Sequence, residues 1–268
     1  MTIISISWVR NEADVIEAFV RHNARFCDRM IITDNDSTDD TPIILERLQT
    51  EGLPLTLRRD PTPVHHQDKA LTDMMHDAHA TMDPDWIFPI DADEFLCCDG
   101  DDVRRILAEH TAPVLIPWRT YVPRPTDPAN ETHLLRRMTW RRTIEKPQFY
   151  KTVVPRGFHD ARYRIPIGGH ELQSVDGTPV LHTPATLLHL AHFPVRSPDQ
   201  ITRKVRHGWA RHLARTNRKD DESFHWKRIL DALPPNALPT PEQLMMIALT
   251  YASDHPYTTD SLIHDPLV

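Results

Sequence analysis

Short apolar runs and amphipathic stretches alternate through the first 118 residues of the chain. Apolar β-branched runs are typical of buried strands, whereas apolar residues spaced three and four apart are typical of one helix face. The runs predict strands over residues 3–9, 30–33, 53–57, 86–90 and 114–118, and the helical spacing predicts helices over 13–26, 41–50, 66–82 and 101–110. Strands that alternate with helices in this way indicate an α/β fold, with a mostly parallel sheet flanked by helices.

The pattern changes after residue 118. Prolines and short β-like pieces prevail over residues 119–198, where no helix is predicted and the strand candidates are 149–154, 180–182 and 186–190. Helical spacing returns over 199–216, 221–233 and 241–252, and we expect the last dozen residues to form a loosely held tail. The chain therefore divides into an α/β half (1–118), an irregular β-containing region of the same domain (119–198) and a C-terminal helical segment (199–268).

Polar clusters directly follow three of the predicted strands. They comprise residues 10–12, the acidic turn 34–40 and residues 91–94. Because the carboxyl ends of parallel strands meet at one sheet edge, where ligands bind in such folds, the three clusters predict a pocket. For residues 34–40 taken alone, a solvated loop before a helix is an equally good interpretation.

The sharpest chemical signal is the pair Asp91 and Asp93, which follows a wholly apolar strand. Carboxylates at the end of a buried strand need a counter-charge. Mg²⁺ and Mn²⁺ prefer oxygen ligands and commonly bridge protein carboxylates to substrate phosphates. The pair therefore predicts a site for a divalent cation.

Glycine is scarce in this chain, with 7 glycines against 24 prolines. No subset of the glycines fits the fingerprint of a dinucleotide-binding fold or of a P-loop, both of which wrap phosphates with closely spaced glycines. The pattern thus disfavours a Rossmann dehydrogenase and a Walker-type NTPase. The net charge of -7 also argues against nucleic-acid binding, which normally shows a basic footprint.

Three cysteines, Cys27, Cys97 and Cys98, are an odd count without zinc-ligand spacing. The first residues lack the basic region of a signal peptide, and no apolar run approaches the roughly 20 residues of a membrane span. We therefore expect reduced thiols in a cytoplasmic protein without a transmembrane segment. Peripheral contact with a membrane stays open.

Three motifs, in order, carry a resemblance to a known family. Residues 6–12 read ISWVRNE, residues 31–41 read IITDNDSTDDT and residues 86–95 read WIFPIDADEF. Together they resemble family-2-type glycosyltransferases of GT-A fold, in the branch whose first strand ends in Asn-Glu and whose metal motif is D-x-D-E-F. The resemblance covers the first half of the chain and implies a nucleotide diphosphate sugar donor, usually a UDP-sugar, with Mn²⁺ or Mg²⁺ bridging its diphosphate.

The same resemblance assigns roles to residues at the predicted sheet edge. It implies that the nucleoside site is lined by Asn11, Glu12, Asp34 and Asp36. It also implies that Asp91 and Asp93 hold the ribose and the metal. Gln67 and Lys69, which open the helix after the third strand, are candidates to approach the nucleotide, although an ordinary polar helix start explains them equally well.

A segment of the second half resembles the same branch less closely. Residues 189–198 read HLAHFPVRSP, similar to its H-[YF]-P-x-[RK]-S segment. The likeness implies His192 as a late metal ligand or diphosphate contact, in line with the affinity of imidazole for Mn²⁺. Arg196 and Lys204 would hold the diphosphate leaving group. A core histidine and a solvated basic face are the alternatives.

Gly168, Gly169, His170 and Glu171, named the GGHE turn below, are the best candidates for the acceptor side. An inverting transfer needs a general base that deprotonates the acceptor hydroxyl. Glu171 or His170 could serve, on a turn whose glycines permit close backbone approach. The match to the acidic residue of inverting relatives is poor here.

The sequence as a whole predicts a metal-dependent glycosyltransferase, expected to be inverting. Its acceptor would be a glycan, a lipid-linked molecule or a small molecule. Two alternatives stay open. The carboxylates could serve a metal-dependent nucleotidyltransferase or phosphoesterase, and the fold could be a non-catalytic module that binds nucleotide sugars.

Overall fold

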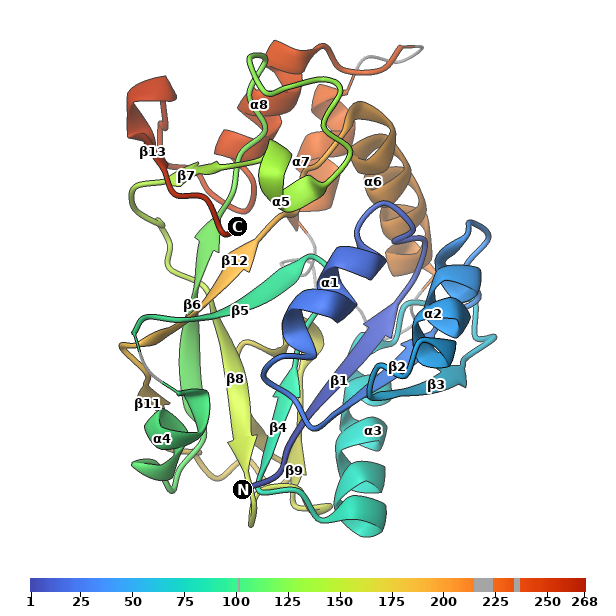
Figure 1. Cartoon of the computed structure of the whole chain (residues 1–268), viewed down its shortest axis with the longest axis vertical. Helices are drawn as coiled ribbons and strands as arrows, with labels where there is room; N and C mark the ends of the chain where they lie inside the picture. Colours follow the sequence, from blue (N-terminus) through green and yellow to red (C-terminus); the bar gives the residue numbers. More distant parts are fainter. Residues whose placement is uncertain (101, 215–223, 234–236) are drawn as a thin grey trace. The chain divides into compact units, whose positions relative to one another are not determined.

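The computed structural model describes residues 1–100, 102–214, 224–233 and 237–268, which form two compact units (Figure 1). The first unit comprises Met1–Thr62, His66–Trp118 and Phe149–Ala191. The second comprises Pro63–His65, Arg119–Gln148 and His192–Val268. The predicted region 119–198 is therefore divided, since most of its second half packs with the α/β half.

The first unit is built on a sheet whose first four strands are parallel. They are β1 (Ile3–Val9), β2 (Arg29–Asp34), β3 (Leu55–Arg59) and β4 (Trp86–Pro89), in the order β3-β2-β1-β4. The sheet continues through β8 (Tyr150–Pro155), β6 (Val114–Thr120), β12 (Leu188–His192) and β5 (Glu94–Cys98), and β11 (Thr183–Pro184) pairs with β6. The predicted fold class, a mostly parallel sheet flanked by helices, is confirmed.

The antiparallel strand β8 lies between β4 and β6. Ile87 of β4 pairs with Val154, and Val114 of β6 pairs with Val153. This insertion brings residues 150–155 next to the strand that ends at the Asp91 turn. The insertion therefore determines that residues of β8 take part in the candidate site.

The helices of the first unit are α1 (Ile16–Asn23), α2 (Thr41–Thr50), α3 (Gln67–Met82) and α4 (Val103–Ala108). Leu71, Met74 and Met75 of α3 form one buried cluster with Ile4 and Ile6 of β1. Each of these side chains contributes roughly 1.5–3 kcal/mol when it leaves water. Alternate residues of β1 thus fix α3 to one face of the sheet.

Two predicted elements of the first unit differ from the structure. The helix expected over 13–26 is shorter and spans Ile16–Asn23. At its last residue the Asn23 side chain bonds the backbone of β5, donating to Glu94 O at 3.0 Å and accepting from Leu96 N at 2.9 Å. The strand β5 itself was not predicted after the acidic motif. Residues 180–182 are not a strand, since β11 begins at Thr183.

Short elements complete the first unit. Strands β9 (Tyr163–Arg164) and β10 (Gln173–Ser174) form a two-stranded antiparallel sheet, and a 3₁₀ turn, η1, spans Ile167–Gly169. The GGHE turn thus lies between the two strands of this small sheet. It follows β8 in the chain.

The second unit contains α5 (Leu134–Arg137), β7 (Trp140–Arg142), α6 (Pro198–Leu213), α7 (Phe224–Ala232), α8 (Pro241–Leu249), η2 (Thr259–Ser261) and β13 (Leu262–His264). Ser197 caps α6 by accepting from Gln200 N, and Thr240 forms a capping box with Gln243 before α8. The helix α5 was not predicted. The predicted end of one helix at 216 and start of the next at 221 lie outside the described residues.

The expectation of a loosely held tail is wrong. Strand β13 pairs antiparallel with β7, with Ile263 opposite Arg141. Asp265 O accepts a hydrogen bond from the Tyr121 hydroxyl at 2.7 Å. Backbone pairing and a buried tyrosine therefore tie the last residues to the second unit.

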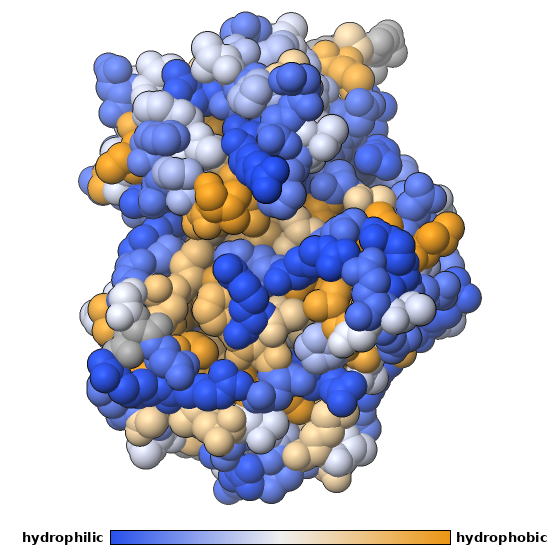
Figure 2. All heavy atoms as spheres, viewed as in Figure 1, coloured by the Kyte–Doolittle hydropathy of each residue, from blue (hydrophilic) through white to orange (hydrophobic). Residues whose placement is uncertain are grey.

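The surface carries both hydrophilic and apolar side chains. On the face shown in Figure 2, hydrophilic residues are interspersed with smaller apolar patches. Among the helices that the structure describes, none combines the length and the apolar character needed to cross a bilayer.

Candidate functional site

The turns that follow β1 and β2 are bonded to each other. Asn11 N donates to Ser37 Oγ at 2.9 Å, and Asn11 Oδ1 accepts from Thr38 N at 2.8 Å. Glu12 N donates to Thr41 Oγ1 at 2.8 Å. Asn11 has φ +55°, a left-handed conformation that asparagine tolerates better than most residues. The structure thus brings the first two predicted polar clusters together.

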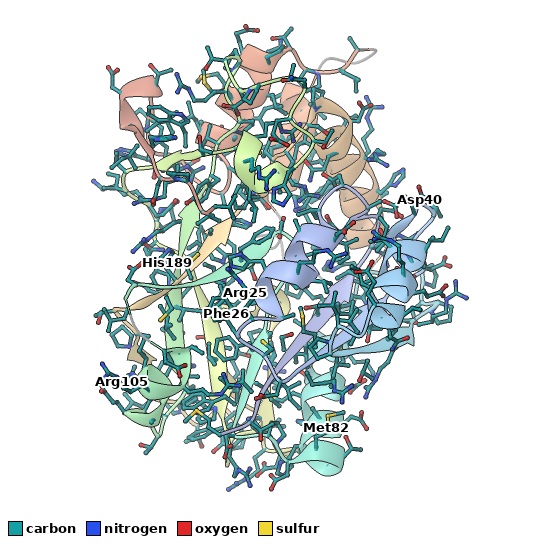
Figure 3. The ribbon with its side chains drawn as sticks, in the orientation of Figure 1. Arg25, Phe26, Asp40, Met82, Arg105 and His189 are labelled. Atoms are coloured by element: carbon teal, nitrogen blue, oxygen red, sulfur yellow. The ribbon has the colours of Figure 1, made fainter. Side chains whose placement is uncertain are left out.

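Asp34 and Asp36 lie in different environments on the second of these turns. Asp34 is 4% exposed, and its Oδ2 accepts from Ser37 N at 3.2 Å. Its Oδ1 is buried, and within the described residues no hydrogen-bond partner reaches it. Such an oxygen favours a ligand that brings a donor, because an unpaired buried polar atom is costly. Asp36 is exposed, before the start of α2, where Asp40 (labelled in Figure 3) precedes the first helical residue.

A polar group that the sequence motifs do not indicate lies at the ends of β1, β2 and β3. The Trp8 indole donates to Asp60 Oδ2 at 2.8 Å, and the Asn35 amide donates to Asp60 O at 3.0 Å. His66 Nε2 lies 3.0 Å from Asp60 Oδ2. The position of Asp60, directly after the third strand, is the signal that could have found it.

Both carboxylate oxygens of Asp91 accept hydrogen bonds from protein side chains. Gln67 Nε2 donates to Oδ1 at 2.8 Å, and Lys151 Nζ donates to Oδ2 at 2.6 Å. The structure thus places Gln67 at the acidic motif. It does not place Lys69 there, because that side chain is 72% exposed and pairs with Asp73, one helical turn further on.

Lys151 is the main residue of the site that the sequence analysis missed. Its side chain is fully buried, and its ammonium lies 2.6 Å from Asp91 Oδ2, 3.1 Å from Glu94 Oε2 and 3.0 Å from Gly168 O. These three acceptors match the three hydrogens of an ammonium group. A single charged residue in the predicted strand over 149–154 is the signal that could have revealed it.

Glu94 completes the buried charge cluster. Its Oε2 accepts from Asp91 N at 2.8 Å, and its Oε1 accepts from the Trp118 indole at 2.8 Å. Burial raises the pKa of Glu94 to about 8, and the charges of Asp91 and Asp93 act in the same direction while Lys151 opposes them. Burial lowers the pKa of Lys151, but Asp91 and Glu94 outweigh this effect and hold it above its usual value. Lys151 is therefore held in its charged form.

Asp93 lies in the turn between β4 and β5 and is 4% exposed. In the part of the chain that the structure describes, no three His, Cys, Asp or Glu residues gather into a group that could hold a metal. Mg²⁺ is often held by one or two carboxylates, with substrate phosphates and water as its other ligands. Asp93 and Asp91 fit a cation of that substrate-bridged kind, and they do not form a complete protein cage.

The GGHE turn is tightly packed. Gly168 and Gly169 have φ +79° and +62°, and a Cβ on Gly168 would lie 2.5 Å from His170 Nε2. Only glycine combines this conformation with this contact. The two glycines therefore allow the chain to fold back against the ring of His170.

The two candidate bases on this turn have different surroundings. The Nδ1 atom of His170 lies 2.8 Å from Tyr150 O, and its ring packs against Trp118 and Phe149, with centroids 5.2 and 5.4 Å away. Burial lowers the pKa of His170 below its usual value. Glu171 is exposed and accepts a hydrogen bond from Gln173. The more accessible carboxylate is thus the freer of the two to meet an acceptor.

His192, Arg196 and Lys204 belong to the second unit. His192 is 3% exposed, and its ring lies edge-on to Tyr251 with the centroids 5.7 Å apart. Arg196 is 2% exposed and donates to Phe193 O at 3.2 Å, so it is not part of a solvated basic face. Lys204 is half-buried on α6.

Comparison with known proteins identifies one matching family. The model of glycosyl transferase family 2 matches residues 6–164, more than half of the chain. No curated protein matches this chain.

Solved structures that are similar to this chain include three that share little sequence with it. TarS 1-349 from S. aureus is 14% identical, with 86% of this chain and 69% of that chain covered and a TM-score of 0.46. The mannosyltransferase PcManGT from Pyrobaculum calidifontis, in complex with GDP-Man and Mn²⁺, is 19% identical, with 93% and 69% covered and a TM-score of 0.43. Glucosyl-3-phosphoglycerate synthase from Mycobacterium tuberculosis, in complex with Mn²⁺, UDP and glucosyl-3-phosphoglycerate, is 18% identical, with 86% and 77% covered and a TM-score of 0.40.

Proposed function

Because this chain belongs to glycosyl transferase family 2, we propose that it transfers a sugar from a nucleotide diphosphate sugar, with UDP as the expected nucleotide, in a reaction that depends on Mn²⁺ or Mg²⁺. The observation that carries this proposal is the turn holding Asp91 and Asp93 at the carboxyl end of β4, inside the matched residues. The acceptor would be a glycan, a lipid-linked molecule or a small molecule. Its attacking group would be a hydroxyl.

The nucleotide would bind at the bonded turns after β1 and β2. Asp34 Oδ1, which is buried without a partner among the described residues, would accept a hydrogen bond from the nucleoside. Asn11, Glu12 and Asp36 would line the same site. Asn11 would keep the two turns together through its bonds to Ser37 and Thr38.

The carboxylates after β4 would face the diphosphate. Asp93, with Asp91 beside it, would hold the cation, which when bound offsets the negative charge that develops on the leaving diphosphate. Gln67 and Lys151 would keep the Asp91 carboxylate in one orientation, since each binds one of its oxygens. The motifs alone suggest His192, Arg196 and Lys204 as diphosphate contacts and Lys69 as a nucleotide contact.

Glu171 would act as the general base of an inverting transfer. It is exposed on the GGHE turn, whereas the His170 ring is packed and uses Nδ1 in a contact with the backbone. His170 would then help to place the turn. A base must lie within hydrogen-bond reach of the acceptor hydroxyl, which an exposed carboxylate permits.

We expect the reaction to take place in the cytoplasm. Cys27 is a buried free thiol, which supports a reducing compartment.

A screen of UDP-, GDP- and dTDP-sugars tests the proposal. We expect one of them to raise the melting temperature in the presence of Mn²⁺ and to be hydrolysed slowly. Asp93→Asn should lower the affinity for that nucleotide sugar with Mn²⁺ by about tenfold or more, which corresponds to about 1.4 kcal/mol. Asp176→Asn, a matched change at an exposed carboxylate, should not. The proposal fails if no nucleotide sugar stabilises the protein, or if Asp93→Asn binds as the wild type does.

A further inference from the structure

A closed ring of hydrogen bonds joins the Asp91 turn to the GGHE turn. Asp91 Oδ1 accepts from Gln67 Nε2 at 2.8 Å, and Gln67 Oε1 accepts from Gly168 N at 3.0 Å. Gly168 O accepts from Lys151 Nζ at 3.0 Å, and Lys151 Nζ donates to Asp91 Oδ2 at 2.6 Å. All four residues belong to the first unit.

The donors and acceptors of this ring are complementary at every contact. The Lys151 ammonium can only donate, and the ionised Asp91 can only accept. Gln67 both donates and accepts, so its amide has one orientation that satisfies Asp91 and the Gly168 N–H together. Both polar groups of the Gly168 backbone and both oxygens of Asp91 are thus bound by the same two side chains.

Little in the ring can adjust locally. Lys151 is fully buried and also lies 3.1 Å from Glu94, and Gly168 is held against the His170 ring in a left-handed conformation. A displacement of Asp91 must therefore be accompanied by a displacement of Gly168, or one of these part-buried hydrogen bonds is lost.

We propose that Gln67 and Lys151 are positioning residues that couple the Asp91 carboxylate to the GGHE turn, so that the nucleotide side of the site sets the placement of the turn carrying Glu171. The assignment of a nucleotide side and an acceptor side rests on the proposed function. The coupling itself rests on the ring, and can be tested without any ligand.

Asp91→Asn tests the coupling because it breaks the donor–acceptor order. The amide at position 91 has one acceptor, its oxygen, which must face the Lys151 ammonium. Its NH₂ group therefore faces Gln67. Gln67 must then turn its oxygen towards residue 91, and its own NH₂ meets the Gly168 N–H, donor against donor. We expect the Gly168 amide to exchange with deuterium about tenfold faster than in the wild type, since an exposed or unbonded amide loses protection.

The second change Gln67→Glu should rescue this variant. A glutamate at 67 accepts from the amide at 91 with one oxygen and from Gly168 N with the other, so Asp91→Asn/Gln67→Glu restores every contact with the same net charge. Exchange at Gly168 should return to the wild-type rate. Asp77→Asn is the matched control, since it is also a change from aspartate to asparagine and lies on α3, as Gln67 does. The Asp77 carboxylate binds Arg58, so this change should leave exchange at Gly168 unchanged. A role limited to general stability predicts no rescue, and absence of rescue overturns the coupling.

Adding Mn²⁺ and UDP separates this inference from the proposed function. In the wild type we expect binding to slow exchange at Gly168, and in Gln67→Met at saturating UDP we expect no such change. If UDP binds the wild type and Gly168 does not respond, the coupling is wrong while the proposed function stands. If no nucleotide binds but the double variant rescues Gly168, the proposed function fails and the coupling stands.

Discussion

Lys151 of the first unit and Arg142 of the second are both buried cations, but they face different partners. Lys151 binds Asp91, whose side chain is 27% exposed, together with Glu94 and a glycine carbonyl. Arg142 binds Glu145 at 2.8 Å and the carbonyls of Ala248 and Tyr251 at 2.7 and 2.9 Å.

The two cations differ in whether the groups that they bind are open to solvent. Arg142 holds carbonyls at the end of α8, and its guanidinium also lies 4.7 Å from the centre of the Tyr257 ring. Its contacts connect parts of a packed core. Lys151 instead orients a carboxylate that remains partly open to solvent. We therefore expect a buried charge with a partly exposed partner, such as Lys151, to serve a ligand site, and one with buried partners, such as Arg142, to serve the packing of the core.

The largest effect should come from Lys151→Met. This change leaves Asp91 and the buried Glu94 without their cation, so the free energy of unfolding should fall by about 3–5 kcal/mol. Affinity for Mn²⁺ and UDP should also fall, because the Asp91 carboxylate loses its orientation. Urea unfolding and calorimetric titration measure the two losses. Thr152→Val is a matched control on the same strand, since the buried Thr152 hydroxyl has no hydrogen-bond partner among the described residues.

Arg142→Met should reduce the free energy of unfolding by about 3 kcal/mol, since Glu145 is left buried without its partner. At a temperature where the variant remains folded, its affinity for Mn²⁺ and UDP should equal that of the wild type. A fall in affinity comparable to that of Lys151→Met would remove the distinction between the two cations.

His22 extends the comparison to a buried group that has no carboxylate partner among its described contacts. Its Nε2 lies 2.7 Å from Leu96 O and its Nδ1 lies 2.9 Å from Nη2 of Arg25, which follows α1 (Figure 3). Burial lowers the pKa of His22 to about 4, and the charge of Arg25 adds to this. The unfolded chain therefore binds more protons than the folded chain between about pH 6.5 and 4, so stability falls as the pH is lowered through this range.

His22→Gln should remove that pH dependence. Between pH 7 and pH 5 the wild type should lose about 2 kcal/mol more of its unfolding free energy than the variant does. Urea unfolding at the two pH values measures this difference. Equal losses in both proteins would mean that His22 is not the group responsible.

The smallest effect should come from the exposed ion pairs between α1 and α2. Glu17 accepts from Arg21 at 2.9 Å and from Arg47 at 2.5 Å, on side chains that are 42–49% exposed. Because water and salt screen such charges, Glu17→Gln should reduce the free energy of unfolding by only about 0.2–1 kcal/mol. The difference should vanish in 1 M NaCl, where the Debye length is about 3 Å. A loss that persists in high salt would contradict this.

The parts of the fold that follow from local pattern could be predicted from the sequence. The strand over residues 3–9 and the helix over 41–50 have the predicted bounds. All seven residues of β1 are buried, including Ser5 and Ser7, which stand among the apolar residues that predict the strand. Strand β13 offers only three residues, and its strand character depends on pairing with β7, which no local pattern reveals.

The residues of the candidate site likewise include some that local sequence predicts and one that it does not. Asp91 and Asp93 stand directly after an apolar strand, so their place at the sheet edge follows from the order of elements. Lys151 is 60 residues away from Asp91 in the chain. It reaches Asp91 only because β8 enters the sheet antiparallel, beside β4. Sequence spacing alone does not predict that insertion.

The hydrogen-bonded ring constrains how this family member and its relatives can diverge. An acid at position 91 requires at position 67 a side chain that both donates and accepts, as glutamine does here. An amide at 91 instead favours a pure acceptor at 67, so the hydrogen bonds of the ring survive a substitution at one position when the other changes with it. Homologous sequences that keep lysine at 151 and glycine at 168 should therefore carry either an acid at 91 with an amide at 67, or an amide at 91 with an acid at 67.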